Sequence, residues 1–321
     1  MHITHANRDH DGPAVQTEGL TKRFGERTAV DGVSLTVPRG TAYGFLGHNG
    51  AGKTTLIRML LGLTRASAGE ASVLGLPVPE QRAEALARVG AIVEEPSFYP
   101  HLTGRENLKI AAAVRGRRAG IESRGRIDQV LRRVGLDQRG GDRVGTYSLG
   151  MRQRLGVARC LLSDPELLIL DEPMNGLDPG GMLDVRRMIR EMVEEEGRTV
   201  FVSSHLLDEV EKTCDVAAII DGGRVIAQGS IQELIGGSAG ELVVECDDTE
   251  RAAGLLAADP AVHELRIEHG VLRMRLLAPD TAGEINARLL SAGVVVSRLE
   301  PVRHSLEERF LEMTTRLEVA A

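Results

Sequence analysis

One stretch of this chain constrains its fold more than any other, because it fits the phosphate-binding pattern G-x-x-x-x-G-K-[ST] at every fixed position. The stretch reads Gly47-His48-Asn49-Gly50-Ala51-Gly52-Lys53-Thr54. An apolar run at 42–46 precedes it, and apolar residues recur at helical spacing from Leu56 to Leu61 after it. Strand, loop and helix therefore follow one another as the motif requires. The alternative is a glycine-rich turn that Lys and Thr follow by chance.

Each residue type in this loop has a physical task. Glycines allow backbone N–H groups to turn inward without Cβ clashes, so that these donors and the helix N-terminus surround the β- and γ-phosphates. Lys53 adds a positive charge. Thr54 offers a hydroxyl to Mg²⁺, and Thr55 is a second donor to phosphate. The loop therefore predicts a nucleotide site that uses Mg²⁺.

Composition limits the other classes of function. The 321 residues suffice for one large domain and a smaller one. A formal net charge of -7 and a pI near 5.8 argue against general binding to nucleic acid or to an anionic lipid surface. No stretch has the length and apolarity of a transmembrane helix, and residues 1–5 lack the apolar core of a signal peptide, so we expect a cytoplasmic protein. Cys160, Cys214 and Cys246 lack metal-site spacing, which predicts reduced structural residues.

The start of the chain divides into a polar leader and a hairpin. We expect residues 1–13 to be disordered, with three histidines that are solvated or, alternatively, bind metal loosely. Apolar and polar residues then alternate from Val15 to Val37 around a turn at Gly25, which predicts two antiparallel strands. Phe24 lies at the tip of the first strand, where it either packs or stacks on a nucleotide base.

Helices and strands alternate through the middle of the chain. We expect strands at 69–74 and 90–93, a helix at 80–88, and helical structure from 102 to 144. Arginines are dense between Arg115 and Arg143, which favours a solvated helical face over a binding surface for an acidic partner. Ser148 is a suitable N-cap for the helix that follows it.

Two polar pairs come directly after buried strands. Asp171 and Glu172 follow the apolar strand 167–170, and Ser204 and His205 follow the strand 199–203. Because ligands bind at the carboxyl ends of strands in open α/β sheets, we expect the carboxylates to face the phosphate loop. Strands at 216–220 and 224–226 would close this domain.

The last quarter of the chain predicts a separate domain. Residues 236–240 are small and flexible, which indicates a linker. Strands are expected at 242–246, 263–268, 271–276 and 294–298, with helices at 249–258, 281–292 and 305–317. The order βαββαβ with a final helix predicts a small α+β domain of the split-βαβ type over 241–321.

Together these blocks resemble the ATP-binding subunit of an ABC transporter over residues 14–235. Five motifs occur in the family's order: the phosphate loop at 47–54, the signature region at 147–151, the strand end at 171–172, the D-loop at 175–178 and the switch histidine at 205. The resemblance implies an α/β P-loop NTPase domain with an antiparallel β subdomain and a helical subdomain at about 97–150. It also sets aside the chance-turn alternative.

The resemblance implies that ATP is bound and hydrolysed with Mg²⁺. Asp171 would orient Mg²⁺ through water together with Thr54. Glu172 would polarise the attacking water, and His205 would contact the γ-phosphate. The family's loop glutamine, which senses Mg²⁺ and the membrane partner, aligns with Glu94. A carboxylate there can ligate Mg²⁺ but adds a negative charge beside the phosphates.

The resemblance also implies that the active site needs a second copy of the chain. Ser148 and Gly150 match the signature residues that meet the γ-phosphate bound by the other copy. The signature usually reads Leu-Ser-Gly-Gly-Gln, whereas Leu149 replaces the first glycine here and Met151 replaces the glutamine. Phe24 matches the base-stacking aromatic. The implied nucleotide contacts are Phe24, Gly47, His48, Asn49, Gly50, Ala51, Gly52, Lys53, Thr54, Thr55, Ser148 and Gly150.

The segments 94–108, 147–151 and 305–312 look like those of bacitracin-resistance and lantibiotic-immunity exporters. This implies export of an antibiotic, peptide or lipid-like compound through an ABC-2-type membrane permease, with membrane contact at the inner face of the plasma membrane through that permease only. One alternative is a soluble ABC-type ATPase acting in translation or DNA repair, which a single ATPase domain without sustained heptads disfavours. Another is a regulatory nucleotide-binding module without turnover, which the presence of both Glu172 and His205 disfavours.

Overall fold

The computed structural model describes residues 12–114, 117–235, 241–276, 281–302 and 305–311. The chain forms two compact units, residues 1–228 and 229–321, which are described separately. Residues 1–11 of the predicted leader and the predicted linker 236–240 lie outside the described residues. Within the described part, no helix is both long and apolar enough to cross a membrane.

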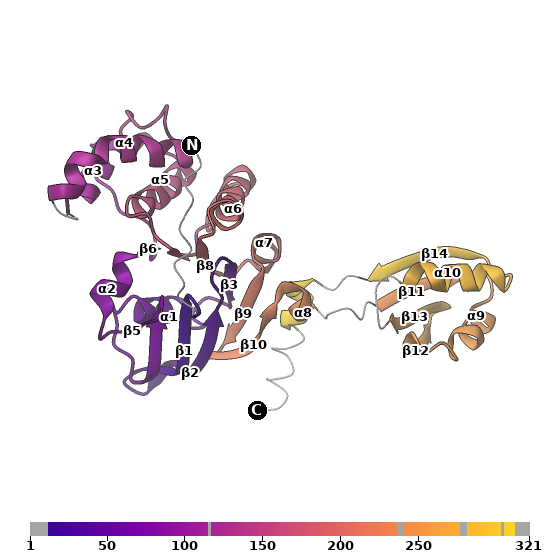
Figure 1. Cartoon of the computed structure of the whole chain (residues 1–321). Coiled ribbons are helices and arrows are strands. Elements are labelled where there is room, and N and C mark those ends of the chain that lie inside the picture. The colour runs from indigo at the N-terminus through magenta and orange to yellow at the C-terminus, as the bar shows by residue number, and fades with distance from the viewer. Residues whose placement is uncertain (1–11, 115–116, 236–240, 277–280, 303–304, 312–321) are drawn as a thin grey trace. The chain divides into compact units, whose positions relative to one another are not determined.

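A six-stranded sheet forms the centre of the first unit (Figure 1). Its order is β10 (Arg224–Ser230), β9 (Val216–Asp221), β3 (Ala42–Leu46), β8 (Thr199–Ser204), β7 (Leu167–Asp171) and β6 (Val89–Ile92). The pairs from β9 to β6 are parallel, and every residue of β3, β7 and β8 is buried. Burial on both faces explains why these strands are continuous apolar runs. The strand predictions for this sheet are confirmed.

A second, antiparallel sheet contains the predicted hairpin. Its order is β2 (Arg27–Val37), β1 (Val15–Phe24), β4 (Ala68–Val73) and β5 (Leu76–Val78). The three-residue strand β5 was missed, because its period-2 pattern is too short to recognise and contains a proline. Helix α1 (Lys53–Leu60) follows the phosphate loop as predicted and buries Leu56, Ile57 and Leu60 in the core shared with this sheet. Helix α2 (Arg82–Ala87) confirms the expected helix with trimmed ends.

Three helices lie together as a helical layer: α3 (Gly104–Val114), α4 (Arg117–Arg133) and α5 (Leu149–Leu161). Thr103 and Glu106 form a capping box at the start of α3, since the Thr103 N–H donates to Glu106 Oε2 at 2.8 Å and the Glu106 N–H donates to Thr103 Oγ1 at 3.2 Å. The prediction of helix throughout 102–144 was too broad. Gly135 adopts φ 66° just after α4, and a left-handed residue there ends a helix.

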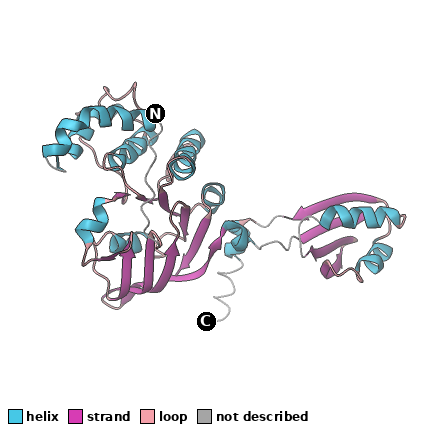
Figure 2. Cartoon of the chain, viewed as in Figure 1, coloured by secondary structure: helices cyan, strands magenta, loops and turns pink. Residues whose placement is uncertain are grey.

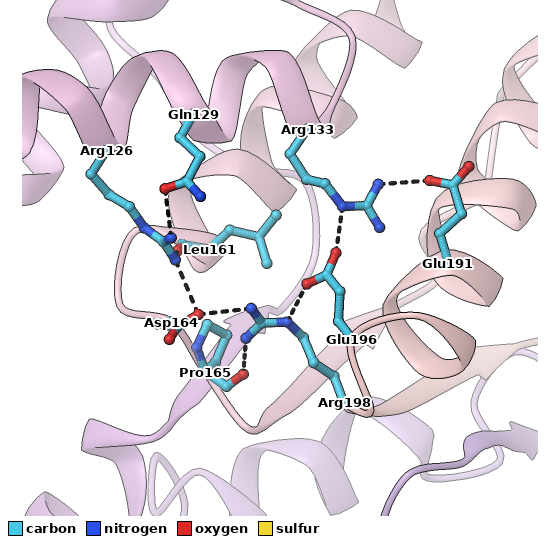
Figure 3. Close-up of polar contacts among 9 residues, drawn as sticks. All are labelled: Arg126, Gln129, Arg133, Leu161, Asp164, Pro165, Glu191, Glu196 and Arg198. Carbon is cyan, nitrogen blue, oxygen red and sulfur yellow. Dashed lines mark hydrogen bonds and ion pairs between the residues drawn. The ribbon is translucent and has the colours of Figure 1, made fainter. Parts of the chain in front are cut away.

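A chain of alternating charges connects this layer to the core (Figure 3). Arg133 on α4 binds Glu191 of α6 (Pro179–Glu194), with Nη1 2.7 Å from Oε2, and it also binds Glu196. Arg198 binds Glu196 at 2.6 Å and Asp164 at 2.7 Å, and its side chain is only 11% exposed. Because these pairs are partly buried and consecutive, they hold α4 against α6 and the turns beside it.

The second unit contains the predicted split-βαβ arrangement (Figure 2). Its sheet order is β12 (Val262–Glu268), β13 (Val271–Leu276), β11 (Glu241–Cys246) and β14 (Val296–Val302), with all neighbours antiparallel. Helices α9 (Thr249–Leu256) and α10 (Thr281–Ser291) pack on one sheet face through Leu256 and Leu289, while a short α8 (Ile231–Ile235) precedes the sheet. Of the predicted final helix, residues 306–311 are helical and the rest lies outside the described residues.

Candidate nucleotide site

An open pocket of about 360 Å³ lies where the phosphate loop meets the hairpin of β1 and β2. A larger hollow of about 680 Å³ lies over β1, β4 and β5, but none of the residues predicted to bind nucleotide lines it. We therefore place the site in the smaller pocket, because charge and motif residues gather there. Its lining consists of Phe24, Arg27, Ala29, Asn49, Gly50, Gly52, Lys53, Thr54, Thr55 and Glu172.

Glycine is required at two positions of the loop by close backbone neighbours. A Cβ on Gly47 would lie 2.4 Å from the carbonyl oxygen of Ile220, and a Cβ on Gly52 would lie 2.4 Å from that of Ala29. Gly52 also adopts φ 108°, a backbone conformation that is strained for any residue with a side chain. It is the N-cap residue of α1. Any side chain at either position would therefore force the loop away from its backbone neighbours.

Lys53 lies across the phosphate loop with a side chain that is only 5% exposed. Its Nζ donates to the carbonyl oxygen of Gly47 at 2.6 Å and to that of His48 at 3.2 Å. The same Nζ lies 3.1 Å from Glu172 Oε1. This ammonium is therefore positioned by backbone carbonyls, and its charge is balanced by a carboxylate at the end of β7.

Asp171 connects the loop helix to two neighbouring strands. Thr54 Oγ1 donates to Asp171 Oδ2 at 2.8 Å, and the buried hydroxyl of Ser203 donates to Asp171 Oδ1. Asp171 and Ser203 are register partners in the parallel pair β7–β8. Asp171 is thus fixed on both oxygens, as the expected meeting of strand ends requires.

Ser203 is a residue of the site that the sequence analysis did not identify as functional. Its hydroxyl also accepts from the Glu172 N–H at 3.0 Å, so that one serine contacts both consecutive acidic residues. In the sequence, Ser203 is recognisable only as a polar residue at the end of an apolar strand. Its contact with Asp171 depends on the register of β8 beside β7. A sequence alone does not specify that register.

Glu172 has the most constrained conformation in the site. Its φ of 49° is unusual for a residue with a side chain, and its N–H is held by the oxygen and hydroxyl of Ser203. Glu172 Oε2 lies 2.8 Å from His205 Nδ1, where an Nδ1–H donates to the carboxylate. Oε1 is buried next to Lys53 without hydrogen-bond geometry. One carboxylate oxygen thus has capacity for a further donor.

Phe24 is 53% exposed at the tip of the hairpin and forms part of the pocket wall. Lys22 Nζ lies 5.0 Å from the centroid of its ring. An exposed ring on a pocket wall offers a face for stacking, which is the prediction made for this residue.

Three predicted site residues lie away from this pocket. Ser148 caps α5, accepting from the Met151 N–H at 3.2 Å, and is exposed; Gly150 follows it beside Leu177. Neither lines the pocket of its own chain. The side chain of Glu94 is 65% exposed, and its Oε1 forms an ion pair with Arg58 Nη2 of α1 at 2.6 Å.

The donor set fits a Mg²⁺-bound nucleoside triphosphate. A Thr hydroxyl and a carboxylate lie within hydrogen-bond distance of each other, as oxygen ligands of one hard cation would. The loop glycines pack closely on Ile220 and Ala29, and the loop leads directly into the N-terminus of α1, a position that favours anionic groups. The buried Glu172 Oε1 without a donor is an acceptor that a water molecule can satisfy.

Comparison with known proteins agrees with this geometry. A sequence model described as ABC transporter matches residues 30–175. The bacitracin transport ATP-binding protein BcrA of Bacillus licheniformis is 39% identical over 300 residues, which cover 93% of this chain and 96% of that protein. The daunorubicin resistance ATP-binding protein DrrA3 of Streptomyces coeruleorubidus is 37% identical over 94% and 96%. The structure of cbiO1 from Clostridium perfringens, part of the ABC transporter complex cbiONQ, has a TM-score of 0.65 at 25% identity, covering 78% of this chain and 97% of that one.

Proposed function

The chain belongs to the ABC transporter family as an ATP-hydrolysing subunit, and from this premise we propose that it drives a separate membrane permease that exports an antibiotic, peptide or lipid-like compound. The relatives that support export are a bacitracin transport protein and a daunorubicin resistance protein. These relatives favour export over the alternative of a soluble ATPase in translation or DNA repair. The observation that carries the proposal is that Lys53 and His205 both contact Glu172, a carboxylate that lines the pocket.

Hydrolysis in this proposal depends on an exchange of partners at Glu172. Lys53 is the cation that would turn toward the β- and γ-phosphates, which leaves Glu172 to accept a proton from the attacking water. His205 orients the carboxylate through Oε2. Thr54 and Asp171 would hold Mg²⁺, whose charge offsets that of the phosphates. Phe24 would stack on the base.

The position of Ser148 supports a site shared between two copies. Ser148 is exposed at the N-terminus of α5, and a helix N-terminus favours an anionic group. Because neither Ser148 nor Gly150 lines its own pocket, we propose that both close over the nucleotide held by a second copy. Leu149 and Met151 replace the usual signature residues, but the serine and second glycine that this contact uses are present.

A hollow lined by residues of β6, α3 and α5 and of the segment 97–99 supports contact with the permease. This hollow measures about 350 Å³ and includes Phe98, Tyr99, Ile110 and Val114 in its lining. Val114 is 83% exposed and Tyr99 54%, and clustered exposed apolar side chains favour a protein partner. We propose that an ABC-2-type permease binds here and holds the chain at the inner face of the plasma membrane.

Phosphate release from Mg-ATP tests the ATPase assignment. Lys53→Ala should abolish ATP binding, whereas Glu172→Gln should retain binding and lower turnover by roughly 10²–10⁴-fold, the usual worth of a positioned base. The matched control is Glu195→Gln, an equal change at an exposed helix end, which should leave turnover unchanged. Turnover of Glu172→Gln at the rate of the unaltered protein would exclude Glu172 as the base.

Two further measurements test assembly and export. Size-exclusion chromatography with Mg-ATP should show a dimer for Glu172→Gln, and the added change Ser148→Arg should remove it, because a bulky cation blocks the proposed contact. Cells that express the chain with its permease should tolerate more bacitracin than cells with the Glu172→Gln form. Equal tolerance would contradict export of that compound and leave the ATPase assignment standing.

A further inference from the structure

Arg27 lies on the pocket wall in a position that the motifs do not describe. It is the first residue of β2 and the register partner of Phe24 across the hairpin turn. Ala29 follows two residues later, and its carbonyl is the group that a Cβ on Gly52 would strike. The start of β2 therefore lies beside the phosphate loop, and Arg27 lines the pocket together with Lys53 and Glu172.

The charges of the pocket leave Arg27 without a counter-ion. Its lining contains three charged side chains, Arg27, Lys53 and Glu172. Lys53 and His205 both lie against the Glu172 carboxylate, so that this acid is already engaged. Among the described residues no hydrogen bond or ion pair involves the Arg27 guanidinium, although many of the other arginines are paired. An unpaired guanidinium on a pocket wall is suited to an anionic ligand.

We propose that Arg27 binds the phosphate chain of the nucleotide, as a second cation opposite Lys53, at the phosphates that ATP and ADP share. The proposal rests on the proposed function, because it assigns a further contact in the same site. Two residues of strand span about 7 Å, which places Arg27 within a side chain's reach of the loop that Ala29 touches. Lys53 and Thr54 serve the β- and γ-phosphates, so the hairpin side of the pocket is left for the phosphate nearer the ribose.

Such a contact forms with the ground state and persists during hydrolysis. Removing it therefore raises KM and leaves kcat unchanged. Hydrogen bonds to charged groups are among the stronger hydrogen bonds in proteins. Because Arg27 is exposed, we take the lower end of their range of free energies, which corresponds to an effect of about 10-fold on affinity. Arg27→Lys keeps the positive charge but loses the paired N–H donors of the guanidinium. This variant should therefore bind the nucleotide more tightly than Arg27→Ala and less tightly than the unaltered protein.

The test measures binding of ATP, ADP and adenosine by calorimetry, with kcat and KM from phosphate release. Arg27→Ala should weaken ATP and ADP about equally, by about 10-fold, and leave adenosine binding and kcat unchanged. Arg23→Ala is the matched control, because Arg23 is exposed on the same hairpin and does not line the pocket. That variant should bind all three compounds as the unaltered protein does.

Three results would overturn the proposal. One is an unchanged KM, a second is a loss for ATP without a loss for ADP, and a third is an equal loss for adenosine, which would place Arg27 at the base or in the fold. In each case hydrolysis by the unaltered chain still supports the ATPase assignment. Absence of hydrolysis in the unaltered chain would instead refute the proposed function.

Discussion

Ser203→Ala tests how the two consecutive acidic residues are held. The hydroxyl of Ser203 donates to Asp171 Oδ1 and accepts from the Glu172 N–H at 3.0 Å. The change removes both bonds and leaves a buried carboxylate oxygen without its donor. The Glu172 N–H keeps its second acceptor, the Ser203 carbonyl at 3.2 Å, so the strand end should survive.

The expected magnitudes follow from these contacts. A buried acceptor that loses its donor costs about 1–3 kcal/mol, which corresponds to a fall in Tm of about 2–12 °C for a unit of this size. Glu172 loses one of the two anchors that hold it at φ 49°, and a catalytic group displaced by about 1 Å can cost roughly 10²-fold in rate. We expect kcat to fall by about 10–100-fold, with KM for ATP changed less than about 3-fold.

Ser204→Ala is the matched control, because Ser204 is also buried at the end of β8 and its hydroxyl accepts from the Leu206 N–H at 2.9 Å. Among the residues that the structure describes, the Ser204 hydroxyl forms no hydrogen bond with Asp171 or Glu172. Phosphate release and thermal unfolding of both variants should show a loss of Tm for each and a loss of kcat for Ser203→Ala alone. Equal rates in the two variants would refute the positioning role of Ser203.

Three further predictions concern the charge chain, the loop acid and the second unit. Burial acts to raise the pKa of Glu196, but hydrogen bonds from Arg198 and Arg133 hold that pKa below its ordinary value. Its stabilisation is complete above the unfolded pKa of about 4.3 and is lost as pH falls through the folded value, so Arg198→Met should reduce the loss of Tm on acidification below about pH 4. Glu94→Gln should change transport-coupled ATP turnover more than basal turnover, and equal effects in reconstituted vesicles would remove the coupling role. A chain shortened to residues 1–235 should still bind Mg-ATP in calorimetry; loss of binding would mean that the second unit supports the fold.

The sequence by itself determined the parts of the site that depend on spacing along the chain. The loop glycines with Lys53 and Thr54 form one continuous motif, and Asp171 and Glu172 follow directly after an apolar strand. In both cases the residues are consecutive or nearly so in the chain. Their positions at the end of a strand or the start of a helix therefore follow from the local secondary structure. The same reasoning recovered the βαββαβ order of the second unit.

Only the tertiary structure decided which distant side chains meet. Ser203 reaches Asp171 because β8 pairs with β7 in one register, and a shift of one residue would turn the serine to the other face. Glu94 forms an ion pair with Arg58 of α1, a contact between residues that are 36 positions apart in the chain. Arg27 lines the nucleotide pocket because the hairpin comes close to Gly52 at Ala29. Such contacts depend on register and packing between separate elements, and composition and periodicity carry no information about either.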